Sequence, residues 1–308
     1  MMNNNGFNNS KSLSEQINEV VNMKATRREK VDMLIKLGIR ENEISFVLPV
    51  EHRVSNPRFV YTFGVEIETY GSDTELFKTL AQDRGLSVYD HLSVYSGCHI
   101  DIQQYKLVPD GSISGYNPAE CVTPVLNGNT TGFESLKECC LSLNEAGAKV
   151  NRSCGLHVHI GAANLTATQY VNTFKNYQKL ERVIDSFMAE SRRANHNSYC
   201  ATLSDHDFGS CCSISDIANE LDNDRYHKVN PMSWGRHMTI EFRQHHGTTN
   251  FTKIKNWVAF CAKLVAWSKN NVLTEEVRSI ADIPFLSATE KRYFEKRANE
   301  LNGVSEAA

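Results

Sequence analysis

The chain has 308 residues, of which 41% are hydrophobic and 22% are charged, and its formal net charge at pH 7 is -3. These values are ordinary for a soluble globular protein, and the small negative charge argues against a general role on nucleic acid or on an acidic membrane surface. The nine cysteines are odd in number, no secretory signal precedes them, no CxxC pair has zinc-finger spacing, and the longest apolar runs are too short to span a membrane. We therefore expect a cytoplasmic protein with free thiols and no structural zinc site.

The first 50 residues are predicted to contain a disordered, asparagine-rich stretch at 1–10 and a small helical segment at 11–50. Helices are expected at 15–23 with Ser14 as N-cap, at 27–37 with Thr26 as N-cap, and at 40–48. The apolar spacing is similar to that of a helix-turn-helix, but the charges are mixed and no recognition helix rich in Arg, Asn and Gln is evident. A nucleic-acid or partner-binding module and a helical appendage that packs on the main domain both fit this pattern.

The remainder, residues 57–301, mixes strand and helix patterns with hairpin-type turns, which favours an α+β domain built on an antiparallel sheet. Strands are predicted at 59–69, within 86–108, at 120–126, in the segment that ends at Gly161, and at 239–248. Helices are predicted at 74–83, 133–146, 168–193, 250–268 and 288–301. Residues 194–223 are expected to be irregular, and 225–233 to form a loop or an edge strand.

Three of the predicted strands carry a pair of ionisable side chains two residues apart. The pairs are Glu66 and Glu68, His157 and His159, and Glu241 and Arg243. Because side chains alternate along a strand, each pair shares one face while apolar residues occupy the other. The pattern predicts a sheet with one apolar face and one face crowded with carboxylates, imidazoles and a guanidinium.

Each pair alone has an ordinary explanation, as a solvated sheet face, a hydrogen-bonded core histidine or a surface ion pair. Together they favour a divalent cation, because clustered carboxylates repel one another unless a counter-charge lies between them. A guanidinium beside such a cation is suited to phosphate. The same acids and histidines would also suit a metal-dependent hydrolase, which activates water without ATP. No GxSxG, HExxH, Walker A or GxGxxG motif is present.

Six short motifs stand in an order that resembles the amidoligase family, carboxylate–amine ligases that share the catalytic core of glutamine synthetase and glutamate–cysteine ligase. They are FGVEIE at 63–68, DGSI at 110–113, ECVTPVL at 120–126, CGLHVH at 154–159, SRR at 191–193 with YC at 199–200, and EFRQHHGT at 241–248. The resemblance covers about residues 60–268. It implies a curved antiparallel half-barrel with helices on its outer face.

The resemblance also implies an ATP-dependent ligase that joins a carboxylate substrate to an amine substrate, small molecule or peptide, through an acyl phosphate. Two or three Mg²⁺ ions, or Mn²⁺, would be held by Glu66, Glu68, Glu120, His157 and Glu241. ATP phosphates would contact His159, Arg243 and Gln244. Arg192, Arg193, Arg236, His237 and His245 are candidates for binding an anionic substrate, for which surface or capping roles are the alternative. Arg243 and Asp110 are the candidate catalytic residues, and Asp110 would hold the incoming amine.

Overall fold

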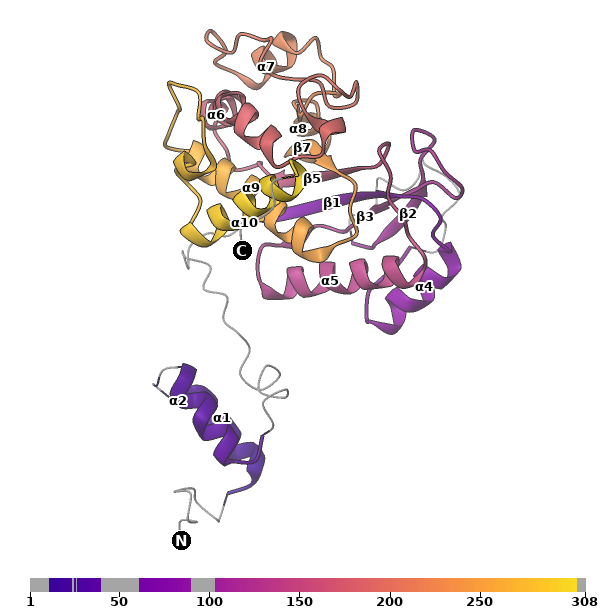
Figure 1. Ribbon diagram of the computed structural model, residues 1–308, viewed down its shortest axis with the longest axis vertical. Helices are drawn as coiled ribbons and strands as arrows, with labels where there is room; N and C mark the ends of the chain where they lie inside the picture. The colour runs from indigo at the N-terminus through magenta and orange to yellow at the C-terminus, as the bar shows by residue number, and fades with distance from the viewer. Residues whose placement is uncertain (1–10, 24, 26, 40–60, 90–102, 304–308) are drawn as a thin grey trace. The chain divides into compact units, whose positions relative to one another are not determined.

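The computed structural model describes residues 11–23, 25, 27–39, 61–89 and 103–303, and the chain divides into two compact units, Met1–Phe59 and Val60–Ala308 (Figure 1). Within the described ranges, no helix combines the length and the apolar character needed to cross a lipid bilayer. The eight cysteines in these ranges are all free thiols.

The described part of the first unit contains helices α1 (Leu13–Asn22) and α2 (Arg27–Lys36), whose buried contact is formed by Val20 and Leu34. The N-cap of α1 is Ser12 and not the predicted Ser14. The Ser12 side chain accepts a hydrogen bond from the Glu15 backbone, and the Glu15 carboxylate accepts one from Ser12 N–H, so this reciprocal pair fixes an earlier helix start. The helix predicted at 40–48 and the disorder predicted at 1–10 lie outside the described residues.

The second unit is built on a seven-stranded antiparallel sheet that does not close into a barrel, which confirms the α+β class. Its strands are β1 (Thr62–Thr69), β2 (Lys106–Pro109), β3 (Ala119–Val122), β4 (Leu126–Asn127), β5 (Gly155–Gly161), β6 (Val229–Asn230) and β7 (Thr239–His246). The strand order is β2-β3-β1-β5-β7-β6, and β4 also pairs with β1. The strands that carry the three polar pairs, β1, β5 and β7, are therefore direct neighbours at the centre.

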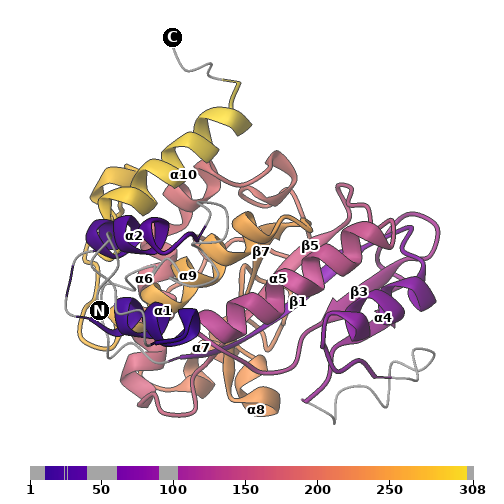
Figure 2. The ribbon, with the colours of Figure 1, turned by 90° about the horizontal axis from the view of Figure 1, so that it is seen from below.

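Alternation along these strands separates an apolar face from a polar face. Ile67, Val158 and Phe242 are fully buried on the apolar face, against a layer formed by α5 (Thr130–Glu145), α6 (Ala167–Ser186) and α9 (Phe251–Ser268). Figure 2 shows α5 and α9 crossing this face. Each fully buried Phe, Leu or Ile contributes about 1.5–3 kcal/mol to stability, so the apolar face holds the sheet on the helices and leaves the other face for polar groups.

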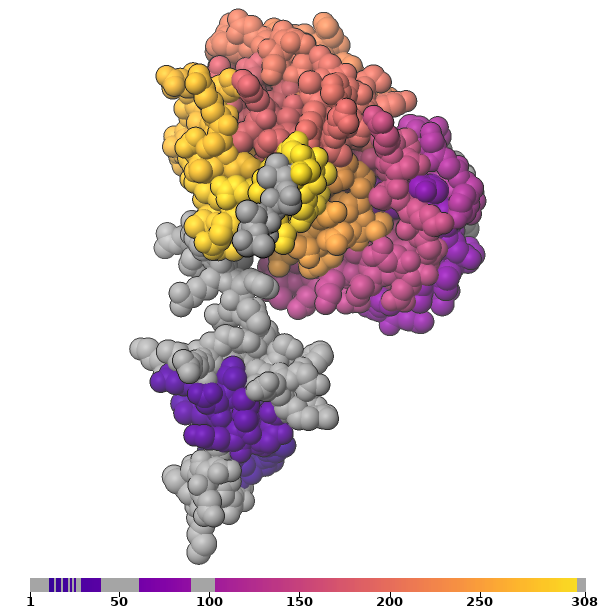
Figure 3. Space-filling model, viewed as in Figure 1, coloured from indigo at the N-terminus to yellow at the C-terminus, as the bar shows by residue number. Residues whose placement is uncertain are grey.

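The remaining helices surround this layer. They are α4 (Thr74–Asp83), α7 (Ile214–Glu220), α8 (Ser233–His237), α10 (Ala288–Leu301) and two short 3-10 helices, Glu190–Arg192 and Ile280–Asp282. Helix α4 packs on α5. Helix α10 packs through Phe294, whose ring centroid is 4.6 Å from that of Phe187 and 5.5 Å from that of Phe260 on α9. In Figure 3 the yellow atoms of the C-terminal part lie beside orange atoms on the visible face.

Two predicted elements are interrupted. The strand expected at 120–126 divides into β3 and β4 because Pro124 has no N–H to donate to a neighbouring strand. At this break the Thr123 hydroxyl accepts a hydrogen bond from Val65 N–H. The helix expected at 168–193 ends at Ser186, and the chain then turns back so that Asp185 accepts from Ala194 N–H. The segment predicted to be irregular contains α7, and the possible edge strand is β6.

Candidate active site

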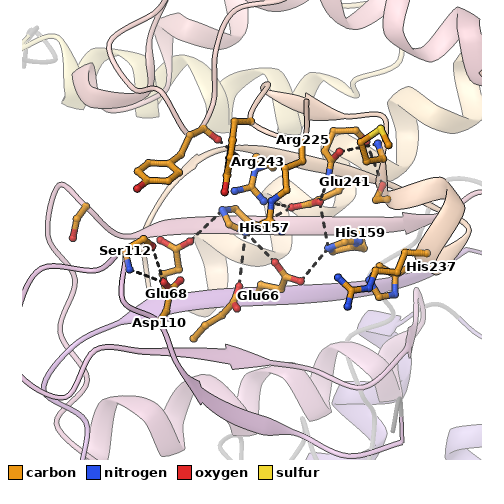
Figure 4. A pocket seen from close by; sticks show the side chains of 18 of the residues that line it. Glu66, Glu68, Asp110, Ser112, His157, His159, Arg225, His237, Glu241 and Arg243 are labelled. Atoms are coloured by element: carbon orange, nitrogen blue, oxygen red, sulfur yellow. Dashed lines mark hydrogen bonds and ion pairs between the residues drawn. The ribbon is translucent and has the colours of Figure 1, made fainter. Parts of the chain in front are cut away.

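The polar face of the sheet is the floor of a pocket of about 450 Å³ (Figure 4). Eleven of the residues selected from the sequence line it: Glu66, Glu68, Asp110, Glu120, His157, His159, Arg192, Arg236, His237, Glu241 and Arg243. They come from the strands β1, β3, β5 and β7 and from the segments that follow β2, α6 and β6. The three polar pairs predicted from alternation therefore meet in one cavity.

Glu66 lies between the two histidines. In the sheet register it is opposite His157, and its Oε2 is 3.0 Å from His157 Nδ1. Its Oε1 is 3.2 Å from His159 Nε2. Burial alone would raise the pKa of Glu66, but His159 and His157 outweigh it, so this pKa lies well below its usual range. Glu66 is therefore an anion that both imidazoles share.

Glu241 occupies the β7 side of the cluster. It is opposite His159 in the register, and its Oε1 is 2.6 Å from a terminal nitrogen of Arg243. Its Oε2 accepts a hydrogen bond of 2.5 Å from the Asn230 amide. Burial would raise the pKa of Glu241, but the charges of Arg243, His159 and His157 together lower it more. Burial would lower the pKa of Arg243, but Glu241, with Glu66 and Glu68, raises it more. Both groups are therefore charged.

Glu120 completes the acidic group from β3. Its Oε1 is 3.9 Å from His157 Nδ1, and it stands opposite Glu68 in the β1–β3 register. Burial, followed by the charges of Glu66, Glu68 and Asp110, raises the pKa of Glu120 well above its usual range. The neighbouring acids therefore disfavour a charged Glu120 carboxylate, and a cation among them would relieve this repulsion.

The donor set fits divalent cations. Two groups each place three ligand atoms within 4.8 Å of one another: Glu66 with Glu120 and His157, and Glu66 with His159 and Glu241. The buried Nε2 of His159 makes no hydrogen bond of ordinary geometry among the described residues. Carboxylate oxygens are the preferred ligands of Mg²⁺ and Mn²⁺, with imidazole as an additional donor. Glu66 is common to both groups.

Arg243 of β7 and the arginines and tyrosines of the segments around it form another wall of the pocket. The Arg243 guanidinium is 5.7 Å from the ring centroid of Tyr226, and the Arg225 guanidinium is 5.1 Å from the same ring. Nε of Arg243 donates to the Tyr199 carbonyl at 3.3 Å. Arg192 is only 2% exposed, and its Nε has no hydrogen-bond acceptor in the described part of the chain. This wall gives the pocket a cationic side that faces the carboxylates.

Three of the selected residues do not line the pocket. Gln244 lies on the helical side of the sheet, where its amide donates to Asp185 and to the Arg192 carbonyl. His245 packs against Trp257, with ring centroids 5.7 Å apart. Arg193 bonds to the Met188 carbonyl and to the Asn302 side chain. We therefore assign none of the three to phosphate or substrate.

Other lining residues were not selected from the sequence. They include Asn230 of the short strand β6 and Tyr199, Arg225 and Tyr226, which come from connecting segments that reach the pocket only through tertiary structure. Asn230 had one detectable signal, the possible edge strand at 225–233, because an edge strand beside β7 would place it near Glu241. Ser112 follows the Asp110-Gly111 turn, and its N–H and hydroxyl both donate to Asp110 Oδ1, at 2.8 and 2.7 Å.

Comparison with known families agrees with this geometry. A family model described as "putative amidoligase enzyme" matches residues 60–207 and 205–265, which together make up more than half of the chain and include every lining residue named above. No curated protein matches the chain at a significant level. The match covers the central sheet with its polar face, and the chain belongs to the amidoligase family.

Proposed function

We propose that the protein is an ATP- and Mg²⁺-dependent ligase that joins a carboxylate to an amine through an acyl phosphate, on a core like that of glutamine synthetase. Family membership points to a ligase. The observation that carries the finer assignment is the pair of cation-donor groups that share Glu66, placed beside the Arg243 guanidinium. Phosphoryl transfer relies on bound cations and on a fixed guanidinium to stabilise the charge on the phosphate oxygens.

The residues that would hold the cations are Glu66, Glu120, His157, His159 and Glu241. Bound Mg²⁺ or Mn²⁺ would offset the charge of the triphosphate as it approaches the anionic carboxylate. In this assignment His159 is a cation ligand, whereas the family resemblance alone implied a phosphate contact.

Arg243 would act on the transferring phosphoryl group. Glu241 and the Tyr199 carbonyl fix the plane of its guanidinium before any ligand arrives, so the charge needs no reorganisation during the reaction. A carboxylate oxygen of the substrate forms a bond to the γ-phosphorus of ATP, and the bond to the β,γ-bridging oxygen breaks to release ADP. The products of this half-reaction are an acyl phosphate and ADP.

The second half-reaction forms the amide. The amine attacks the activated carbonyl carbon, the C–O bond to phosphate breaks, and the proton lost by the amine nitrogen is taken up by the departing phosphate. Asp110 would hold the incoming amine, since its bonds from Ser112 fix one carboxylate oxygen at the wall of the pocket. Arg192, Arg236 and His237 would bind the anionic part of the substrate. We place this reaction in the cytoplasm, where ATP is abundant and thiols stay reduced.

The test is ADP release from Mg-ATP in the presence of a panel of amino acids and amines, with products identified by mass. Glu66→Gln removes a charge from both cation groups, and Arg243→Ala removes the guanidinium; each should lower amine-dependent ADP release by about 100-fold or more. If both variants kept the wild-type rate, the proposal would fail. A metal-dependent hydrolase would instead be stabilised in thermal denaturation by the cation alone, with no added effect of ATP.

A further inference from the structure

Arg192 is a buried cation that lines the pocket and is only 2% exposed. Its terminal nitrogens donate to the Ser153 carbonyl at 3.3 Å and to the Cys200 sulfur at 3.9 Å, and its Nε has no acceptor in the described part of the chain. Burial raises the pKa of the Cys200 thiol, so both of these acceptors are neutral. A buried guanidinium with neutral acceptors is costly unless an anion pairs with it, and the pocket is where an anion can enter.

The backbone of Arg192 is tied to the helical side of the sheet by Gln244. The amide nitrogen of Gln244 donates to the Arg192 carbonyl at 3.2 Å and to Oδ1 of Asp185. Its amide oxygen accepts from the hydroxyl of Tyr177 on α6. Because Gln244 is fully buried and both amide hydrogens have an acceptor, the amide has one orientation that satisfies all of its partners.

The β-bulge brings Gln244 next to the pocket wall. Arg243 and Gln244 of β7 both fall opposite His157 of β5. Arg243 lines the pocket, whereas Gln244 bonds to α6 on the other side of the sheet. Two consecutive residues therefore serve the same wall from its two sides, one with a guanidinium in the pocket and the other with an amide behind it.

We infer that Gln244 is a positioning residue for Arg192. By holding the Arg192 carbonyl on the helical side of the sheet, it fixes the base of the side chain, so that the guanidinium is already ordered when an anionic group of the substrate arrives. A long side chain that is ordered in advance loses less entropy on binding, which strengthens the contact. The inference rests on the proposed function, which gives Arg192 the anionic part of the substrate.

The first test uses full-length protein with ¹⁵N-labelled arginine side chains and follows the Nε–H signal of Arg192, assigned by its absence in Arg192→Met. Acetate is the probe, and sodium chloride at the same ionic strength controls for screening. Acetate should shift the signal of the wild-type protein, because Nε is the donor without an acceptor. Gln244→Met keeps the length of the side chain but removes the amide. In this variant the signal should exchange faster with water, and the half-maximal shift should need about 10-fold more acetate.

Tyr177→Phe is the matched control. It removes a hydrogen bond from the same buried network but leaves both bonds that the Gln244 amide donates. Its melting temperature should fall, whereas the acetate midpoint and the exchange of Nε–H should stay as in wild type. Gln244→Asn is the second variant should Gln244→Met not fold, because its shorter side chain keeps an amide that cannot reach both Asp185 and Arg192. It should weaken acetate binding in the same way.

The second test is kinetic and uses the carboxylate substrate found with the panel of amino acids and amines. Gln244→Met should raise the KM for this substrate about 10-fold, and should change the KM for ATP and kcat much less. In an Arg192→Met background it should have no further effect on the KM for the carboxylate, because a positioning residue acts only through the guanidinium.

Three outcomes would overturn the inference. They are equal effects of Gln244→Met and Tyr177→Phe on the acetate midpoint, additive effects of Gln244→Met and Arg192→Met on the KM, and a wild-type Arg192 signal that does not respond to acetate. A protein that released no ADP with any member of the panel would refute the proposed function, while the acetate titration would still test the link between Gln244 and Arg192.

Discussion

At the residue scale, Arg243 depends on geometry as well as on charge. Its terminal nitrogen bonds to Glu241 and its Nε to the Tyr199 carbonyl, and an ammonium group cannot make both bonds in one plane. Arg243→Lys should therefore lower ADP release on the order of 100-fold, although the charge is kept. Steady-state rates with the melting temperature recorded alongside test this. A lysine variant as active as wild type would show that charge alone suffices.

Alternation along the strands predicted most of the pocket floor but failed beyond Arg243. Between the pairs Val158–Phe242 and Leu156–His245, β5 has one residue and β7 has two, so a β-bulge lies there. The extra residue turns His245 to the apolar face shared by Leu156, although simple alternation places it with Arg243. A bulge of this kind leaves no signature in the spacing of polar and apolar residues. Gln244 was selected only because it lies inside the family motif.

At the element scale, α6 anchors the segment 192–203 that forms one wall of the pocket. Lys228 is fully buried and contacts Glu181 at 2.7 Å and Asp185 at 2.8 Å. The same Glu181 carboxylate accepts from Leu203 N–H at 2.8 Å and from the Thr202 hydroxyl. This segment is therefore tied to the core, which positions Tyr199 and Arg192.

Lys228→Met should destabilise this wall, because it leaves two largely buried carboxylates without a cation. The expected loss is about 3–5 kcal/mol of unfolding free energy, with faster hydrogen exchange in residues 192–203. Lys263→Met is the control, since it breaks a half-buried pair with Glu290 at 2.6 Å and should cost about 1 kcal/mol or less. Equal effects of the two variants in urea denaturation would contradict the anchoring role.

The end of β7 should make stability depend on pH. Burial, with smaller effects of Arg297 and Lys253, lowers the pKa of His246 to about 4. The unfolded chain binds this proton near pH 6.5, so it holds more protons than the folded state between about pH 4 and 6.5, and stability falls as the pH drops through that window. Between pH 7 and pH 5 the loss should be about 2 kcal/mol, by linkage.

The variant His246→Gln isolates this effect because it has no proton to gain. Its unfolding free energy in urea should fall about 2 kcal/mol less than that of wild type between pH 7 and pH 5. Parallel curves for the two proteins would rule out His246 as the source.

Elements with strong local signals were predicted well, and those defined by tertiary contacts were not. Helix α4 has the predicted bounds because Asp73 caps it and accepts from Leu76 N–H. Strand β6 has only two residues, and its place beside β7 depends on pairing rather than on its own sequence. The early end of α6 likewise follows from the contact between Asp185 and Ala194.

For the whole molecule, the proposed reaction requires that one cavity bind a nucleotide triphosphate, a carboxylate and an amine in succession. Every side chain proposed for this chemistry lies between residues 66 and 243, inside the unit Val60–Ala308. The order of motifs along the chain was enough to identify the family. The convergence of β1, β5 and β7 could be foreseen from their polar pairs, whereas the contribution of Tyr199, Arg225 and Tyr226 to the cationic wall could not, because these residues come from loops.

The most direct test of the acyl phosphate intermediate traces an oxygen atom from the carboxylate substrate to the released phosphate. The carboxylate substrate found in the amine panel is labelled with oxygen-18 and incubated with Mg-ATP and amine, and the released phosphate is analysed by mass spectrometry. An acyl phosphate transfers one carboxylate oxygen to phosphorus, so the account predicts one labelled oxygen in each phosphate per amide formed. The proposal would be contradicted if the phosphate released from the labelled carboxylate carried no label, and if label entered phosphate only when the reaction was run in oxygen-18 water.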